Sequence, residues 1–153
     1  MWNKIVNFFM LRFYRLKKRL NQWQQSLESE FAEEFLQGLL SAMSMMFCVN
    51  KDFRRNIKGF NARYLFRSRD DKITIAAIFK GGKMKVKEKK IDNTNITITF
   101  KDDKALMKYL LSPKPDILGS ILNQEVTYKG NLNYLAKFAF MAKRLQLMMT
   151  GKI

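Results

Sequence analysis

The spacing of apolar residues is helical at both ends of the chain and strand-like in between. Apolar side chains recur at three- and four-residue steps over residues 1–27, and a second helical pattern runs from about Ser29 to about Val49. Between residues 57 and 100 apolar and polar side chains alternate, which is typical of strands that bury one face. These periods predict two helices followed by an antiparallel sheet whose other face is solvated.

Turn residues set the limits of the strands. Alternation over residues 60–66, 73–79, 84–90 and 96–100 predicts four strands. Asp70-Asp71 predicts the turn after the first strand, and Gly81-Gly82 predicts a tight turn after the second. The first three strands are therefore expected to pair as consecutive hairpins.

The C-terminal third returns to helical spacing. Asp102 is predicted to cap a helix that ends near Leu111, and a short helix over 116–122, a strand over 126–128 and a last helix over 132–148 follow. The last helix carries Phe138 on one face and Phe140 on another. A sheet covers only one face of a helix, so this surplus predicts contact with another helix, a partner, a membrane or a ligand.

The charge of the chain is strongly positive. Its 153 residues suit one compact domain, 47% of them are hydrophobic, and the formal net charge is +16. Such a field attracts phosphates, either of nucleic acid or of anionic lipid headgroups. Lysines 83, 85 and 87 form a row on the third strand, which either contacts phosphates or is a solvated edge that prevents aggregation.

Residues for catalysis or metal binding are few. The chain has no histidine, and its one cysteine, Cys48, excludes an internal disulfide and a thiolate zinc site. Cys48 lies in an apolar run and is predicted to be a core residue. Asp102 and Asp103 lack a third ligand nearby in the sequence and suit helix capping better than metal binding. We therefore expect no enzyme activity, no metal and no cofactor.

The predicted helix over residues 1–27 is basic and aromatic. No acidic residue precedes Glu28, and apolar residues surround the first turns almost completely. Such a helix suits a bilayer interface, where each Lys or Arg near an anionic leaflet contributes roughly 1 kcal/mol. The alternative is a helix that packs on its own domain or on a second subunit. The predicted membrane contacts are Trp2, Ile5, Val6, Phe8, Phe9, Arg12, Phe13, Arg15, Lys18 and Arg19.

Targeting signals give a coarse expectation of location. No apolar run reaches the eighteen or so residues of a spanning helix, and no small-residue cleavage site follows the apolar start. We expect a cytoplasmic protein that associates peripherally with membranes.

The segment from Asn95 to Leu147 contains ITITF with an acidic cap and an apolar helix, a proline-containing linker, a short apolar helix, a strand that ends in YKGN, and a helix of the form LxxLAKF. This series of features resembles the sterol carrier protein type 2 (sterol-binding domain) family. With the helix and hairpins upstream, the resemblance covers roughly residues 30–148. The basic N-terminal helix is not part of the family pattern, so we divide the chain into residues 1–27 and a domain over 28–153.

The resemblance implies an α+β fold in which helices cover one face of a five-stranded, mostly antiparallel sheet, with an apolar tunnel between them. In the family such tunnels hold sterols, acyl chains, phospholipids or isoprenoid quinone intermediates. The implied function is to bind a lipid without chemistry and to transfer or present it at a membrane, for instance to a lipid-metabolising enzyme or as a homodimer. The implied lining residues are Phe35, Leu39, Met43, Ile98, Phe100, Leu106, Leu110, Leu118, Ile121, Leu122, Leu135, Phe138, Ala142 and Leu145.

Two other functions fit parts of the sequence. Nucleic-acid binding suits the charge, but the aromatic residues recur at core-facing periods and no recognition motif is present. A scaffold at the membrane surface, with a filled core and no ligand, also suits the pattern. Each lining residue above is equally a credible core residue.

Overall fold

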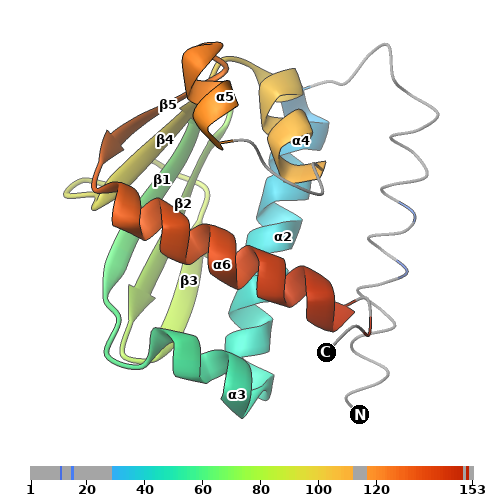
Figure 1. Ribbon diagram of the computed structural model, residues 1–153, viewed down its shortest axis with the longest axis vertical. Helices are drawn as coiled ribbons and strands as arrows, with labels where there is room; N and C mark the ends of the chain where they lie inside the picture. The colour runs from blue at the N-terminus through green and yellow to red at the C-terminus, as the bar shows by residue number, and fades with distance from the viewer. Residues whose placement is uncertain (1–10, 12–14, 16–28, 112–116, 150, 152–153) are drawn as a thin grey trace.

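The computed structural model describes residues 11, 15, 29–111, 117–149 and 151 (Figure 1). Most of the predicted N-terminal helix lies outside these residues. Leu11 and Arg15, which are described, are helical and exposed.

A five-stranded mixed sheet forms one layer of the molecule. Its strands are β1 (Ala62–Ser68), β2 (Thr74–Lys80), β3 (Lys83–Lys87), β4 (Ile96–Phe100) and β5 (Val126–Gly130), in the spatial order β3-β2-β1-β4-β5 (Figure 1). β1 pairs in parallel with β4, and the other neighbours are antiparallel. The sheet is therefore mostly antiparallel, which confirms the prediction.

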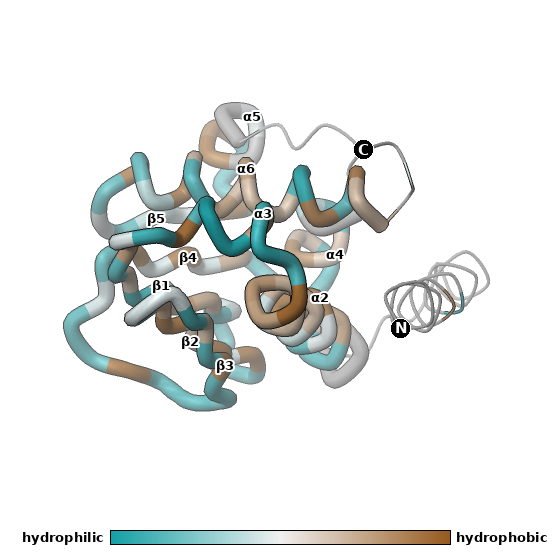
Figure 2. Tube along the Cα trace, turned by 90° about the horizontal axis from the view of Figure 1, so that it is seen from below, coloured by the Kyte–Doolittle hydropathy of each residue, from teal (hydrophilic) through white to brown (hydrophobic). Residues whose placement is uncertain are grey.

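The helices cover one face of this sheet. They are α2 (Ser29–Val49), α4 (Asp103–Leu111), α5 (Ile117–Leu122) and α6 (Leu132–Met149). α6 crosses in front of the strands, whereas α2 runs beside β3 (Figures 1 and 2). Asp102 caps α4 as predicted, because its carboxylate accepts a hydrogen bond from the Ala105 amide at 2.8 Å.

One pair of elements was not predicted. The chain continues after α2 into α3 (Lys51–Arg54) and a 3-10 turn (Arg55–Ile57), so the first strand begins at Ala62. The Asn50 side chain caps α3 by accepting from the Phe53 amide at 2.8 Å. Arg54 then donates to the carbonyl groups of Phe47 and Cys48 at the end of α2, which satisfies groups that a helix terminus leaves unpaired.

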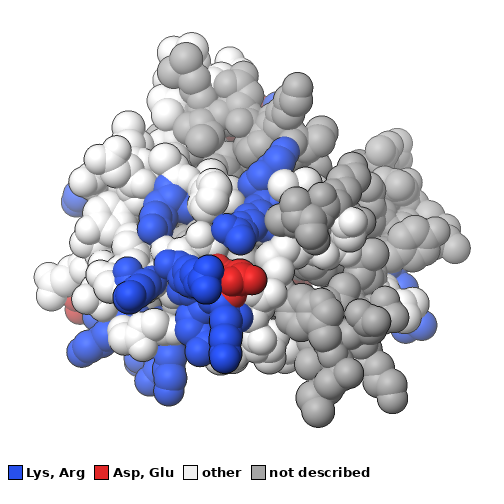
Figure 3. Space-filling model, turned by 60° about the horizontal axis from the view of Figure 1, so that its bottom comes forward, with Lys and Arg blue, Asp and Glu red and all other residues white. Residues whose placement is uncertain are grey.

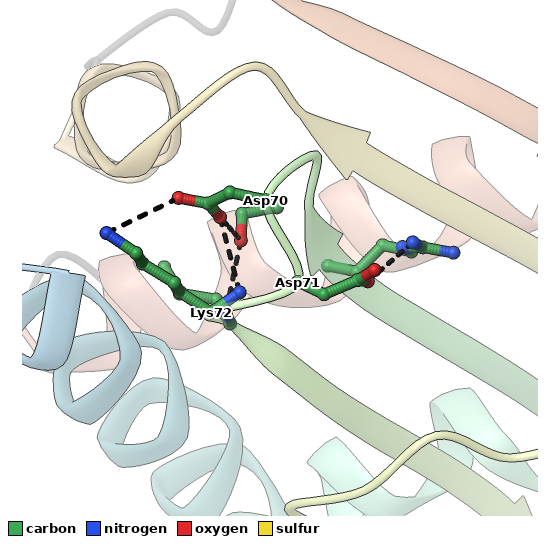
Figure 4. A network of polar contacts seen from close by, with 6 residues as sticks. Asp70, Asp71 and Lys72 are labelled. Carbon is green, nitrogen blue, oxygen red and sulfur yellow. Dashed lines mark hydrogen bonds and ion pairs between the residues drawn. The ribbon is translucent and has the colours of Figure 1, made fainter.

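Two predicted turns join the antiparallel strands. Gly81 and Gly82 have φ of 60° and 71°, the left-handed conformation that a two-residue hairpin turn requires. In the turn after β1, Asp70 accepts hydrogen bonds from the Ser68 hydroxyl and the Lys72 amide, while Asp71 pairs with Arg67 (Figure 4). The Ser68 hydrogen bond lowers the pKa of Asp70 below its ordinary value.

The core fills the layer between sheet and helices. Buried side chains from α2, α4, α6 and the helix-facing side of every strand form one continuous apolar cluster. Large aromatic and sulphur-containing residues dominate it, among them Tyr64, Phe79 and Met43. Ser68 is the buried polar residue within the described part of the chain. A smaller cluster of Leu65, Ala76 and Ile91 lies on the opposite face of the sheet.

The prediction that Cys48 is a core residue was wrong. Cys48 is exposed, as are Met45 (40%) and Val49 (44%), which share the outer side of α2. The sequence from Met45 to Val49 is apolar at every position, so its period does not show which side faces the core. Met46 and Phe47 supply the buried side instead.

Candidate functional site

The layer between the sheet and the helices is the candidate site, because the predicted lining residues converge there. Eight of them are buried members of the main core cluster: Phe35, Met43, Ile98, Phe100, Leu106, Leu135, Phe138 and Leu145. Leu39 and Ala142 are partly buried against the same cluster. These ten residues come from α2, β4, α4 and α6, which face one another across the layer.

The four remaining residues lie at the end of the layer formed by α4 and α5. Ile121 and Leu122 are exposed by 36% and 73%. The side chains of Leu110 and Leu118 fall outside the described residues. Apolar side chains on α5 therefore meet solvent beside the layer, and the tunnel itself stays a prediction.

Aromatic contacts fix α6 against the sheet. The Phe138 ring lies 5.1 Å from the Phe66 ring and 5.5 Å from the Tyr64 ring, centroid to centroid. On the outer side of the same helix, Leu132 and Phe140 are exposed by 55% and 56%. α6 thus has apolar residues on two sides, as the sequence predicted, and the second side is open to a partner or a membrane.

Two tyrosine hydroxyls, those of Tyr64 and Tyr128, bring polar groups into this layer. The Tyr64 hydroxyl donates to the Tyr134 carbonyl at 2.7 Å, so its burial is compensated. The Tyr128 hydroxyl is buried and makes no hydrogen bond of normal length and angle to a described residue. Burial, with a smaller effect of the neighbouring Tyr109 hydroxyl, raises the pKa of Tyr128. Both hydroxyls are therefore neutral donors at physiological pH.

The sequence analysis quoted Tyr128 in the YKGN motif but assigned neither Tyr109 nor Tyr128 to the binding site. Tyr128 lies two residues after the buried Val126 in β5, and its partner in β4 is the buried Ile98, so it is on the helix side of the sheet. Tyr109 belongs to α4 and packs its ring 5.8 Å from the Phe100 ring. The spacing of apolar residues indicates which face of α4 or β5 each tyrosine occupies. It does not show that α4 and β5 bring Tyr109 close to Tyr128, because that depends on the tertiary structure.

Basic side chains occupy the other surfaces. Lys83, Lys85 and Lys87 are exposed on edge strand β3. They alternate with Met84 and Val86 and point away from the helix layer. Figure 3 shows further Lys and Arg side chains gathered at the end of the molecule where α3 and the β2–β3 turn lie. This distribution suits contact with an anionic surface.

A shallow cavity of about 320 Å³ lies on the uncovered face of the sheet. Leu65, Arg67, Asp71, Thr74 and Lys90 line it. Arg67 is held there by its ion pair with Asp71 (Figure 4). The cavity therefore differs in position and polarity from the predicted tunnel, which lies on the helix side.

The described residues form neither a metal site nor a membrane-spanning helix. No group of three or more Cys, Asp or Glu side chains there is arranged to hold a metal ion. None of the helices in the described part of the chain is long and apolar enough to cross a bilayer. The layer between the sheet and the helices is lined by apolar side chains and contains a few hydroxyl groups that can donate hydrogen bonds. Such a layer suits binding of an apolar molecule.

Comparison with known proteins identifies the fold. No family model and no curated protein matches the chain in sequence. Among solved structures, the chain is similar to a UbiJ-SCP2 ubiquinone synthesis protein, with a TM-score of 0.54, 12% identity, and coverage of 71% of this chain and 93% of that one.

Two further structures show the same fold in different settings. The sterol carrier protein domain 2 of Helicoverpa armigera matches with a TM-score of 0.55, 14% identity, and coverage of 78% of this chain and 94% of that one. A variant of the sec-alkyl sulfatase PisA1 matches with a TM-score of 0.55 and 16% identity, over 75% of this chain but only 16% of the enzyme. The chain therefore has a sterol-carrier-like fold, which occurs both as a separate protein and as a part of a larger enzyme.

Proposed function

We propose that this chain binds a lipid in the layer between its sheet and its helices, and transfers or presents it at an anionic membrane without catalysing a reaction. The observation that carries the proposal is the sterol-carrier-like fold, together with the meeting of ten predicted lining residues in that layer. Each lipid methylene moved from water into such an environment contributes about 0.8 kcal/mol.

The membrane part of the proposal is supported by charge. Lys83, Lys85 and Lys87 have no carboxylate partner among the described residues, so their charge is available to lipid phosphates. We assign the stronger membrane contact to residues 1–27, whose sequence combines basic and aromatic residues, and the lipid site to residues 28–153. A lipid-modifying enzyme is a suitable recipient, because the fold also occurs inside an enzyme.

Lipid transfer between vesicles tests this proposal. The full chain is expected to move a fluorescent phospholipid from donor to acceptor vesicles that contain phosphatidylglycerol, and to do so more slowly as salt is raised. A variant without residues 1–25 is expected to stay folded and to take up the probe, but to transfer it at least about tenfold more slowly, because it loses six basic side chains of roughly 1 kcal/mol each.

Two outcomes separate the parts of the proposal. If the shortened variant binds and transfers as well as the full chain, residues 1–25 are not the membrane contact. If neither form takes up any lipid probe while circular dichroism shows a folded chain, the lipid-binding function is refuted, and the ligand-free scaffold is the better account.

A further inference from the structure

Tyr128 is a polar side chain of the helix-facing layer whose hydroxyl the described residues leave without a regular hydrogen bond. Its hydroxyl oxygen is shielded from solvent and makes no hydrogen bond of normal length and angle to any described residue, and the neighbouring Tyr109 hydroxyl interacts with it only at longer range. A buried hydroxyl without a partner costs free energy that replacement by phenylalanine would recover. Tyr64, on the same face of the sheet, shows the usual arrangement, since its hydroxyl donates to the Tyr134 carbonyl.

Tyr109 brings a second hydroxyl to the same place from the opposite side. Tyr128 belongs to β5 and Tyr109 to α4, and both are partly buried against the core cluster. Burial raises the pKa of Tyr109 as well. Tyr109 on α4 and Tyr128 on the edge strand β5 are thus close enough to affect one another, and both pack against the apolar core cluster.

We propose that the Tyr128 hydroxyl, with Tyr109 beside it, is the hydrogen-bonding anchor for the oxygen-bearing end of the bound lipid. The inference rests on the proposed lipid-binding function and adds the chemical class of the ligand. That class is an uncharged lipid that ends in a hydroxyl, carbonyl or ester oxygen and has an apolar body.

A carboxylate does not suit this position. A buried anion needs a cation or several donors to offset its loss of hydration. The basic residue next to Tyr109 is Lys108, whose ammonium group is 3.1 Å from Glu125 and whose side chain is 70% exposed. A neutral oxygen requires only the donor that Tyr128 supplies.

Competition between two ligands that differ by one hydroxyl tests the anchor. Hexadecanol and hexadecane would each be titrated against a fluorescent acyl probe bound to the full chain, to its Tyr128→Phe variant and to its Tyr64→Phe variant. In Tyr128→Phe we expect hexadecanol to bind roughly five- to tenfold more weakly and hexadecane to bind unchanged, which is the effect of one hydrogen bond. The Tyr64→Phe control should not alter the ratio of the two affinities.

Thermal unfolding provides a second readout. Tyr128→Phe is expected to unfold at the same temperature as the wild-type chain or at a higher one, because it removes an unsatisfied hydroxyl, whereas Tyr64→Phe should unfold at a lower one. If the wild-type chain binds both compounds and Tyr128→Phe weakens both equally or neither, the anchor is refuted and lipid binding stands. If the wild-type chain binds neither compound nor the probe, the proposed function itself is refuted.

Discussion

Replacing Phe138 with alanine is expected to lower the free energy of unfolding by about 3–5 kcal/mol. Phe138 is 4% exposed and packs against the rings of Tyr64 and Phe66, so truncation leaves a cavity where α6 meets the sheet. A charged residue at this position is expected to cost still more, because it would bury an unpaired charge. Urea denaturation followed by circular dichroism measures the change.

The same helix supplies a matched control. Phe140 is two residues away and 56% exposed, so Phe140→Ala should change the free energy of unfolding by less than about 0.5 kcal/mol. Equal losses in the two variants would contradict the assignment of the inner and outer sides of α6. Because Phe138 supports the fold, a ligand test at this site should use a conservative change such as Phe138→Leu and compare probe uptake at equal folded fraction.

Gly130→Ala is expected to destabilise the chain by at least about 2–3 kcal/mol. Gly130 has φ of 121°, and an added Cβ atom would lie 2.2 Å from the Asn95 carbonyl oxygen. That carbonyl accepts a hydrogen bond from the Asn131 amide at 3.1 Å, so the clash falls on the link between β5 and the start of α6. The midpoint of urea unfolding should fall accordingly.

Gly38→Ala is the control for this substitution. Gly38 lies inside α2 with nothing within 4 Å of a new Cβ, so alanine should stabilise the chain by about 0.5–1 kcal/mol through its higher helix propensity. Opposite signs for the two glycines are the expected result. A Gly130→Ala variant as stable as the wild-type chain would show that β5 and Asn95 are not as close as described.

The sequence predicted the fold well where local chemistry decides it. Gly81-Gly82 and the capping residue Asp102 act through their own backbone conformation and nearest amides, so their roles were predicted correctly. Alternation placed Tyr64 and Ile98 on the same buried face of the sheet, as found. The four-residue helix α3 was missed because it is shorter than the window in which helical periodicity is visible.

The candidate site was predictable in part. The family resemblance implied the lining residues, and ten of them do face inward. The resemblance does not distinguish residues inside the layer from those at its open end, so Ile121 and Leu122 were included although they are exposed. The sequence also does not show which tyrosine hydroxyls form hydrogen bonds. The Tyr64 hydroxyl has an acceptor because α6 places the Tyr134 carbonyl beside it, whereas the Tyr128 hydroxyl has no such acceptor among the described residues.

The most direct test of lipid binding is mass spectrometry of organic extracts from the purified full chain, with a protein of similar size and charge purified in parallel. We expect the same uncharged, oxygen-containing lipid in every preparation, in a roughly stoichiometric amount and absent from the parallel protein. Extracts that contain no enriched lipid, together with no uptake of added acyl probe by the folded chain, would contradict the account.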